Sequence, residues 1–133
     1  MTDIFNRIFT PLATMLRQNH SGIFVTGERV PAPSVFPSVV FIEADSYEDQ
    51  RSMDNSLREN ITALMYEVTV FSNKVGGKRS ECVEILSEID DYMKAANARR
   101  IARVEGYFDT EAKIYMLTAR YNVKTDGTNL YTF

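Results

Sequence analysis

The sequence contains few of the residues around which catalytic and metal sites are usually built. Among 133 residues there is one cysteine, Cys82, one histidine, His20, and no tryptophan. A single cysteine excludes a disulfide within the chain and fits folding in a reducing cytoplasm. We interpret Cys82 as a small core residue and His20 as a surface turn residue, because neither has ligand or nucleophile partners at suitable spacing. CxxC, HExxH, GxSxG and Walker A motifs are also absent.

The chain also lacks a long apolar run and a strong excess of either charge. No stretch approaches the roughly 18 apolar residues of a membrane span. Met1 to Leu16 lacks the basic start and clean apolar core of a signal peptide, since Asp3 and Arg7 fall within it. The net charge of −3 offers no general attraction to nucleic acid or to an anionic membrane. We therefore expect a protein that folds in the cytoplasm and has no membrane partner.

The most regular pattern in the sequence lies between Glu59 and Glu88. Residues 60–73 alternate as a strand does, and one face carries Leu64, Tyr66, Val68 and Val70. Gly76 and Gly77 then break the extended chain. Ser80 is predicted to cap a helix with one apolar stripe, made of Cys82, Val83, Ile85, Leu86, Ile89 and Met93. A strand and a helix joined in this way indicate a structural unit, not a reaction centre.

Further elements are predicted on both sides of this unit. An amphipathic helix covers residues 4–16, and Pro11 is expected to kink or split it. Residues 23–30 form a candidate edge strand, and residues 38–44, after a proline-rich connector, form a strand that is apolar on both faces. Asn97 is predicted to end the second helix, and residues 101–108 and 113–124 then form a hairpin.

These elements predict one α+β domain over residues 1–133. We expect an antiparallel sheet of four to five strands with two helices packed on one face. The polar residues 45–58 predict a flexible loop that is longer than a hairpin needs. Residues 125–133 predict a polar C-terminal tail.

The strongest candidates for chemistry are three carboxylates. Glu43 and Asp45 are two residues apart near a strand end, so we expect both to point to one face, with Glu67 nearby in mid-strand. Paired carboxylates are suited to acid–base catalysis or to cation binding. No nucleophile, histidine or cofactor loop accompanies them. We therefore favour a solvated rim or ion pairs with a neighbouring subunit, and we assign no catalytic residue, metal ligand or cofactor.

A basic group lies near the end of the second helix. It contains Arg99, Arg100 and Arg103, and it lacks the interleaved aromatic residues of a nucleic-acid site. We predict that these arginines pair with the acidic 43–54 region across a subunit contact. The predicted contact residues are Glu43, Asp45, Arg99, Arg100 and Arg103.

Four segments of the chain carry a resemblance to a known family. They are VFPSVVFIEAD, ENITALMYEVTVFSNKVGGKRSECVEILSEIDDYM, RRIARVEG and IYMLTARYNV, and they cover roughly Phe36 to Val123. Their order and pattern resemble the small tail terminator proteins of long-tailed bacteriophages, which are also called tail completion or head–tail joining proteins. The best markers are Phe36-Pro37, Tyr66-Glu67-Val68, Phe71-Ser72-Asn73, Gly77-Lys78 and Arg120-Tyr121.

The resemblance implies a structural virion protein without enzymatic activity. Such proteins form a ring, usually of six subunits, that caps the tail tube, stops its polymerisation and presents a surface to the head connector. The implied partners are other copies of the chain, the tail tube protein and the connector or neck proteins, while DNA passes through the ring without specific recognition. The implied location is the head-proximal end of the virion tail, and the host cytoplasm during assembly.

Two other functions remain open at this point. One is a head-side connector or neck adaptor, which would also be a small ring-forming protein. The other is a small enzyme that uses Glu43, Asp45 and Glu67.

Overall fold

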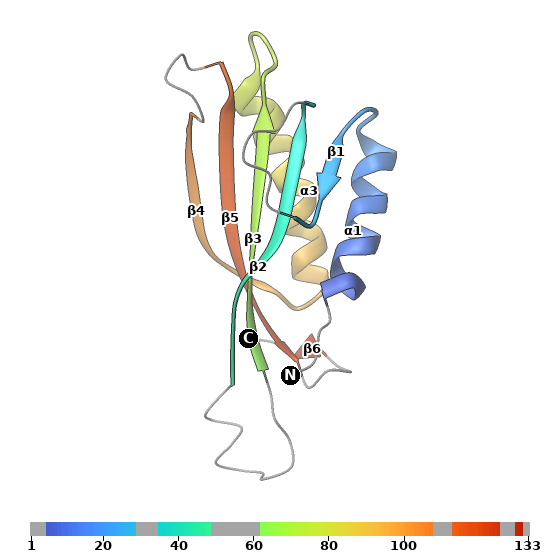
Figure 1. The fold of residues 1–133 in the computed structure, drawn as a ribbon, viewed down its shortest axis with the longest axis vertical. Helices are drawn as coiled ribbons and strands as arrows, with labels where there is room; N and C mark the ends of the chain where they lie inside the picture. The colour runs from blue at the N-terminus through green and yellow to red at the C-terminus, as the bar shows by residue number, and fades with distance from the viewer. Residues whose placement is uncertain (1–4, 29–34, 49–61, 108–112, 126–129, 132–133) are drawn as a thin grey trace.

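Two helices cover one face of a long sheet (Figure 1). The computed structural model describes the backbone of residues 5–28, 35–48, 62–107, 113–125 and 130–131, without the side chains of residues 45–48, 62 and 130–131. The elements are, in chain order, α1 (Phe5–Asn19), β1 (Phe24–Thr26), β2 (Ser38–Glu48), β3 (Thr62–Ser72), α3 (Lys78–Ala95), β4 (Arg99–Tyr107), β5 (Tyr115–Thr125) and β6 (Leu130–Tyr131). The predicted α+β class is confirmed.

The strand order of the sheet is β1-β2-β3-β5-β4, and the short β6 pairs with the end of β5. All strand pairs are antiparallel except β1 and β2, which run in parallel with Phe24 opposite Ser38. The prediction of a purely antiparallel sheet is therefore wrong at this edge. The reason is that β2 begins at the same end of the sheet as β1, whereas two strands joined by a hairpin run in opposite directions.

The main core lies between the sheet and the helices. The alternation predicted for β3 is confirmed, because Leu64, Tyr66, Val68 and Val70 are all fully buried on the helix-covered face. Burying a side chain of this kind contributes roughly 1.5–3 kcal/mol, so the set supplies much of the stability. The other core residues come from both helices and the flanking strands, and include Ile8, Leu12, Leu16, Phe41, Ile85, Ile89, Met93, Leu117, Ala119 and Tyr121.

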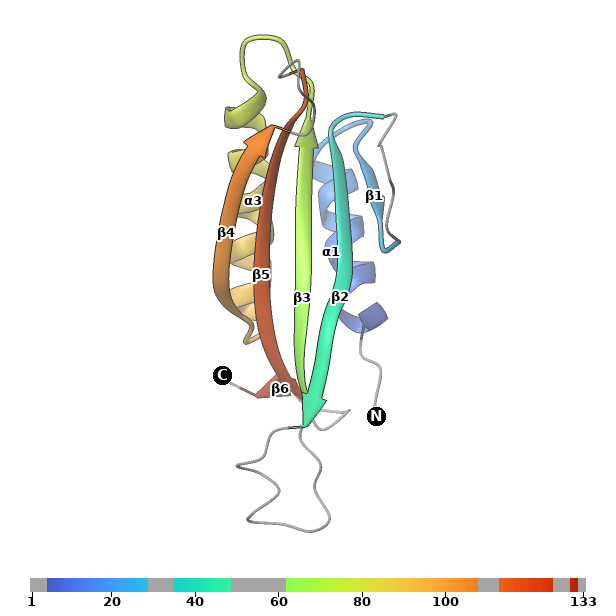
Figure 2. The ribbon, with the colours of Figure 1, turned by 60° about the vertical axis from the view of Figure 1, so that its left-hand side comes forward.

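The opposite face of the sheet carries no described helix and is visible in front in Figure 2. A second, smaller apolar cluster lies there, made of Val40, Ile42 and Phe71 with Phe36, Ile114 and Met116 packed against them. Residues 38–42 of β2 are therefore buried on both faces, as the sequence predicted, whereas Glu43 and Ala44 are exposed. The rest of this open face is more polar.

Helix α1 runs without interruption from Phe5 to Asn19, with Pro11 inside it. The prediction that Pro11 would split the helix is therefore wrong. Pro11 lies on the exposed side, whereas Ile8, Leu12 and Leu16 are buried against the sheet. The packing of this apolar face outweighs the loss of one backbone donor.

Helix α3 begins three residues earlier than its sequence suggested. Its N-cap is Gly77, which makes no side-chain cap hydrogen bond, and Ser80 lies inside the first turn. The hydroxyl of Ser72 donates instead to Oε1 of Glu81 over 2.7 Å, which joins the end of β3 to the start of α3. At the other end the prediction is confirmed, because Asn97 adopts a left-handed φ of 65° after the last turn.

The extent of the strands corrects two predicted irregular segments. Residues 45–48, expected as the start of a loop, continue β2 to Glu48 and pair with β3. The remainder of the predicted 45–58 loop lies outside the described residues. In the predicted 125–133 tail, Thr125 ends β5 and Leu130–Tyr131 form β6 beside it.

Candidate functional site

The strand register does not place Glu43 and Asp45 at positions on the same face of the sheet. Strand β2 contains a bulge, so that Glu43 lies opposite Tyr66 while Asp45 lies opposite the adjacent Met65. Neighbouring residues of β3 face opposite sides of the sheet. The extra residue, Ala44, therefore breaks the two-residue alternation on which our same-face prediction depended.

Glu67 is held elsewhere by an ion pair. It lies opposite Ile42 and Arg120, and its Oε1 is 3.7 Å from Nη2 of Arg120 on the open face. A hollow of about 220 Å³ adjoins this pair, lined by Glu67, Ala102, Val104, Thr118 and Arg120. Its walls offer a carboxylate, a guanidinium and a hydroxyl, but no histidine or cysteine. Within the described part of the chain, no three His, Cys, Asp or Glu residues are grouped as metal ligands would be.

The candidate residues instead mark the two opposite margins of the sheet. We call residues 43–48 of β2, which lie past its pairing with β1 and include Glu43, Asp45 and Glu48, the acidic edge. We call β4, which carries Arg99, Arg100 and Arg103, the basic edge. Three strand spacings, roughly 14 Å in total, separate β2 from β4. The two edges therefore lie too far apart to pair within one chain.

The strand register places these charges in the same cross-strand rows. One row, from β2 to β4, consists of Asp45, Met65, Asn122 and Arg99, and the next consists of Glu43, Tyr66, Tyr121 and Arg100. Each row thus has a carboxylate at one end and an arginine at the other. The sequence indicated both charged groups, but it could not show that they end the same rows.

Arg100 also takes part in a network that fixes the basic edge to α3. Its Nη1 lies 3.6 Å from Oδ1 of Asp90, and Lys94 Nζ lies 3.2 Å from Oδ2 of the same carboxylate. The hydroxyl of Tyr121 donates to Asp90 Oδ1 over 3.1 Å. Burial, together with the negative charge of Asp90, raises the pKa of Tyr121 well above its ordinary value. Our sequence analysis missed Asp90, although a carboxylate between Leu86 and Met93 on an apolar helix stripe was a visible signal.

Replacing Asp90 by alanine should destabilise the fold. The hydroxyl of Tyr121 would lose its acceptor in the core, and an unsatisfied buried donor costs about 1–3 kcal/mol. Urea unfolding of Asp90→Ala should show this loss. Asp91→Ala removes a carboxylate from the neighbouring, exposed position and should change stability by less than about 0.5 kcal/mol. Equal effects of the two substitutions would contradict this role of Asp90.

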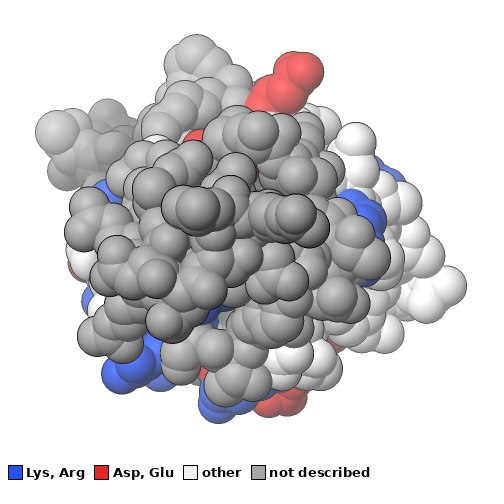
Figure 3. All heavy atoms as spheres, turned by 90° about the horizontal axis from the view of Figure 1, so that it is seen from below, with Lys and Arg blue, Asp and Glu red and all other residues white. Residues whose placement is uncertain are grey.

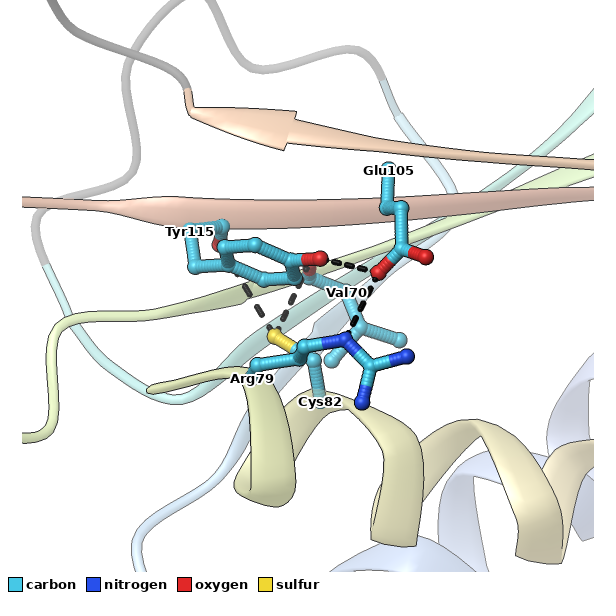
Figure 4. Close-up of polar contacts among 5 residues, drawn as sticks. All are labelled: Val70, Arg79, Cys82, Glu105 and Tyr115. Carbon is cyan, nitrogen blue, oxygen red and sulfur yellow. Dashed lines mark hydrogen bonds and ion pairs between the residues drawn. The ribbon is translucent and has the colours of Figure 1, made fainter. Parts of the chain in front are cut away.

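A second set of contacts fixes the other end of β4 (Figure 4). Nε of Arg79, in the first turn of α3, is 3.0 Å from Oε2 of Glu105, and the Tyr115 hydroxyl donates to the same oxygen. The hydrogen bond from Tyr115 and the bond from Arg79 hold the pKa of Glu105 below its ordinary value. Of the charged residues of β4, Arg100 and Glu105 are thus engaged within the chain. Arg99 and Arg103 make no ion pair with the residues that the structure describes.

Cys82 is a core residue, as the sequence predicted. Its thiol is fully buried and lies 3.6 Å from the Val70 carbonyl oxygen and 3.8 Å from that of Tyr115 (Figure 4). Burial raises the pKa of this thiol to about 12. It is therefore protonated and inert at neutral pH.

This raised pKa predicts a loss of stability at alkaline pH. The unfolded chain releases the thiol proton near its ordinary pKa of 9.0, whereas the folded chain keeps it to about 12. Between these values the folded state binds more protons, so the free energy of unfolding falls as pH rises. Cys82→Ala should make this decline shallower in urea unfolding between pH 8 and pH 10.5. An unchanged slope would contradict the assignment.

His20 differs from the simple surface turn residue that we predicted. Its Nε2 contacts Oε2 of Glu88, and Nδ2 of Asn19 donates to Glu88 Oε1 over 2.7 Å. The hydroxyl of Tyr92 also donates to the Ile8 carbonyl oxygen over 2.9 Å. These contacts join α1 to α3, so His20 has a structural role in the turn.

No family model and no curated protein matches this sequence. Across the described segments, no helix combines the length and apolar character needed to cross a membrane. In Figure 3, which views the molecule from below, Lys and Arg residues are visible at several separate places near the margin of the view. The features of the site that bear on function are therefore the two oppositely charged edges of the sheet.

Proposed function

We propose that this chain is a structural virion protein whose copies form a ring that caps the tail tube of a long-tailed bacteriophage. The ring would stop polymerisation of the tube and present the surface to which the head connector docks. In this proposal the described scaffold positions contact surfaces and carries out no bond-breaking step.

The observation that carries the proposal is the placement of opposite charges at the two ends of the same rows of the sheet. Glu43 and Asp45 end two rows on the acidic edge, and Arg100 and Arg99 end them on the basic edge. A ring is a heterologous assembly, in which one face of each subunit meets a different face of the next. Two complementary surfaces on opposite sides of one subunit are what such an assembly requires.

The family resemblance supports the proposal from the sequence. The segments that carry it correspond to β2, β3, α3, β4 and β5, which are the elements that hold both charged edges in place. The positioning of the basic edge depends on α3, because Arg79 and Asp90 of that helix bind Glu105 and Arg100 of β4.

Electron microscopy of particles assembled without this protein would test the proposal. Tails that are overlong or lack a finished head-proximal end are expected, and adding the purified protein should restore tails of normal length. Normal tails detached from filled heads would instead identify a neck adaptor. Normal, complete particles assembled without the protein would contradict both the tail-capping role and the neck-adaptor role.

A further inference from the structure

The basic edge is a long strand whose outer side carries no other described strand. β4 is the last strand in the order of the sheet, spans nine residues, and contacts β5 on its other side. Ile101, Val104 and Tyr107 are 44%, 64% and 57% exposed along it. A long edge strand with exposed apolar side chains is a ready template for another strand, and proteins usually cover or blunt such an edge.

The acidic edge offers a complementary strand. β1 covers β2 only from Ser38 to Val40. Residues 44–48 of β2 have β3 on one side, and no described strand lies on the other. Both margins of the sheet thus include a stretch of strand that can accept a neighbour.

The strand directions match for head-to-tail pairing. β2, β3, β5 and β4 follow one another in antiparallel pairs, so β4 runs opposite to β2. When a second copy is placed beside the first by rotation about an axis along the strands, β4 of one copy meets β2 of the next in antiparallel orientation. The antiparallel alternation of the sheet then continues from copy to copy along the part of β2 that β1 leaves uncovered.

Charge favours this pairing over the pairing of two identical edges. If β4 paired antiparallel with β4 of another copy about Ile101, Arg99 of each copy would lie opposite Arg103 of the other, and like charges opposite each other destabilise a strand pair. Pairing with β2 brings Arg99 and Arg100 to the row ends that carry Asp45 and Glu43. The preferred partner of β4 is therefore the acidic edge of a second copy.

We infer that the first part of β4, residues 99–103, adds as an antiparallel strand to residues 41–45 of β2 in the next copy, where β1 leaves β2 uncovered. This inference names the contact between neighbouring subunits of the proposed ring. Only the closure of the copies into a ring rests on the proposed function. Strand addition also accounts for the exposed Ile101, which would be covered at each contact. Val104 lies instead in the row of Val40, where β1 already pairs with β2.

Cysteine crosslinking between two separately labelled chains tests this contact. One chain carries Ala44→Cys and the other Ile101→Cys, which are the extra residues of the two bulges, so every charged side chain is retained. The native Cys82 does not interfere, because it is fully buried and protonated. A short bismaleimide is added to the mixed, folded proteins, and the products are identified by peptide mass spectrometry.

The 44–101 product should form at least about tenfold faster than any control product, because strand pairing raises the effective concentration of the two thiols. The controls are 44–44 pairs, 101–101 pairs, and Val75→Cys, at a 93% exposed position, with Ala44→Cys. Adding Arg99→Glu and Arg103→Glu to the Ile101→Cys chain should reduce the 44–101 product to the control rate.

Equal rates for all pairs, or a dominant 101–101 product, would overturn the inference. The proposed function fails separately. Rings on tail ends without the 44–101 product would leave the function standing and refute strand addition. A strong 44–101 product, together with normal particles from cells that lack the protein, would support strand addition and refute the proposed function.

Discussion

Reversing Arg99 and Arg103, which make no ion pair with the described residues, is expected to prevent assembly of the proposed ring. In the variant Arg99→Glu, Arg103→Glu, each contact would bring glutamates to the edge that carries Glu43 and Asp45. Like charges across a contact cost several kcal/mol, so we expect association to weaken by at least about a hundredfold. Sedimentation velocity at matched concentrations measures this loss. Arg100 is left unchanged because it holds Asp90 inside the chain.

Two further variants separate this effect from a general effect of charge. Lys74→Glu with Lys78→Glu makes the same change in net charge at the glycine turn, away from both edges, and should assemble as the wild type does. Adding Glu43→Lys and Asp45→Lys to the reversed arginines restores opposite charges and should recover assembly. Association unaffected by the arginine reversal, or no recovery in the fourfold variant, would contradict the predicted contact.

Removing the Phe41 ring is expected to have the largest effect on folding. Phe41 is fully buried, and its ring centroid lies 5.4 Å from that of Phe5, 6.0 Å from that of Phe9 and 5.2 Å from that of Tyr66. It therefore joins α1 to the centre of the sheet. Truncating a packed phenylalanine to alanine costs about 3–5 kcal/mol, a large part of the roughly 5–15 kcal/mol that stabilises a domain.

Chemical denaturation of Phe41→Ala measures this cost. Phe24→Ala is the matched control, since Phe24 lies on the edge strand β1 and is 38% exposed. We expect it to lose less than half as much stability, and Phe41→Leu to lose less than Phe41→Ala because it refills most of the volume. Similar losses at positions 41 and 24 would show that the aromatic group is not central to the core.

The sequence predicted the parts of the fold that follow from side-chain periodicity. The alternation in β3 placed Leu64, Tyr66, Val68 and Val70 on the core face, and the apolar stripe of α3 placed Cys82 beneath the sheet. These patterns are strong because a shift by one residue would expose a whole apolar face. The parallel β1 was not predictable in this way, since strand direction depends on the path of the connector.

The parts of the site that the sequence did not predict depend on strand register. Bulges at Ala44 and Ile101 shift the alternation by one residue, and neither bulge has a glycine or another clear signal. Because the sequence does not reveal the bulge at Ala44, a regular alternation was assumed, and Glu43 and Asp45 were expected on one face. Likewise, the alignment of both with Arg99 and Arg100 became visible only once all four strands were paired.

Native mass spectrometry of the purified protein, alone and after mixing with tail tubes, tests the central claim most directly. A ring built through the two charged edges predicts one discrete species of fixed copy number, six by the family resemblance, either free or bound to tube ends. Raising the ionic strength should shift this species toward the monomer, because exposed ion pairs are screened. A protein that stays monomeric at all concentrations and never binds tube ends would contradict the account.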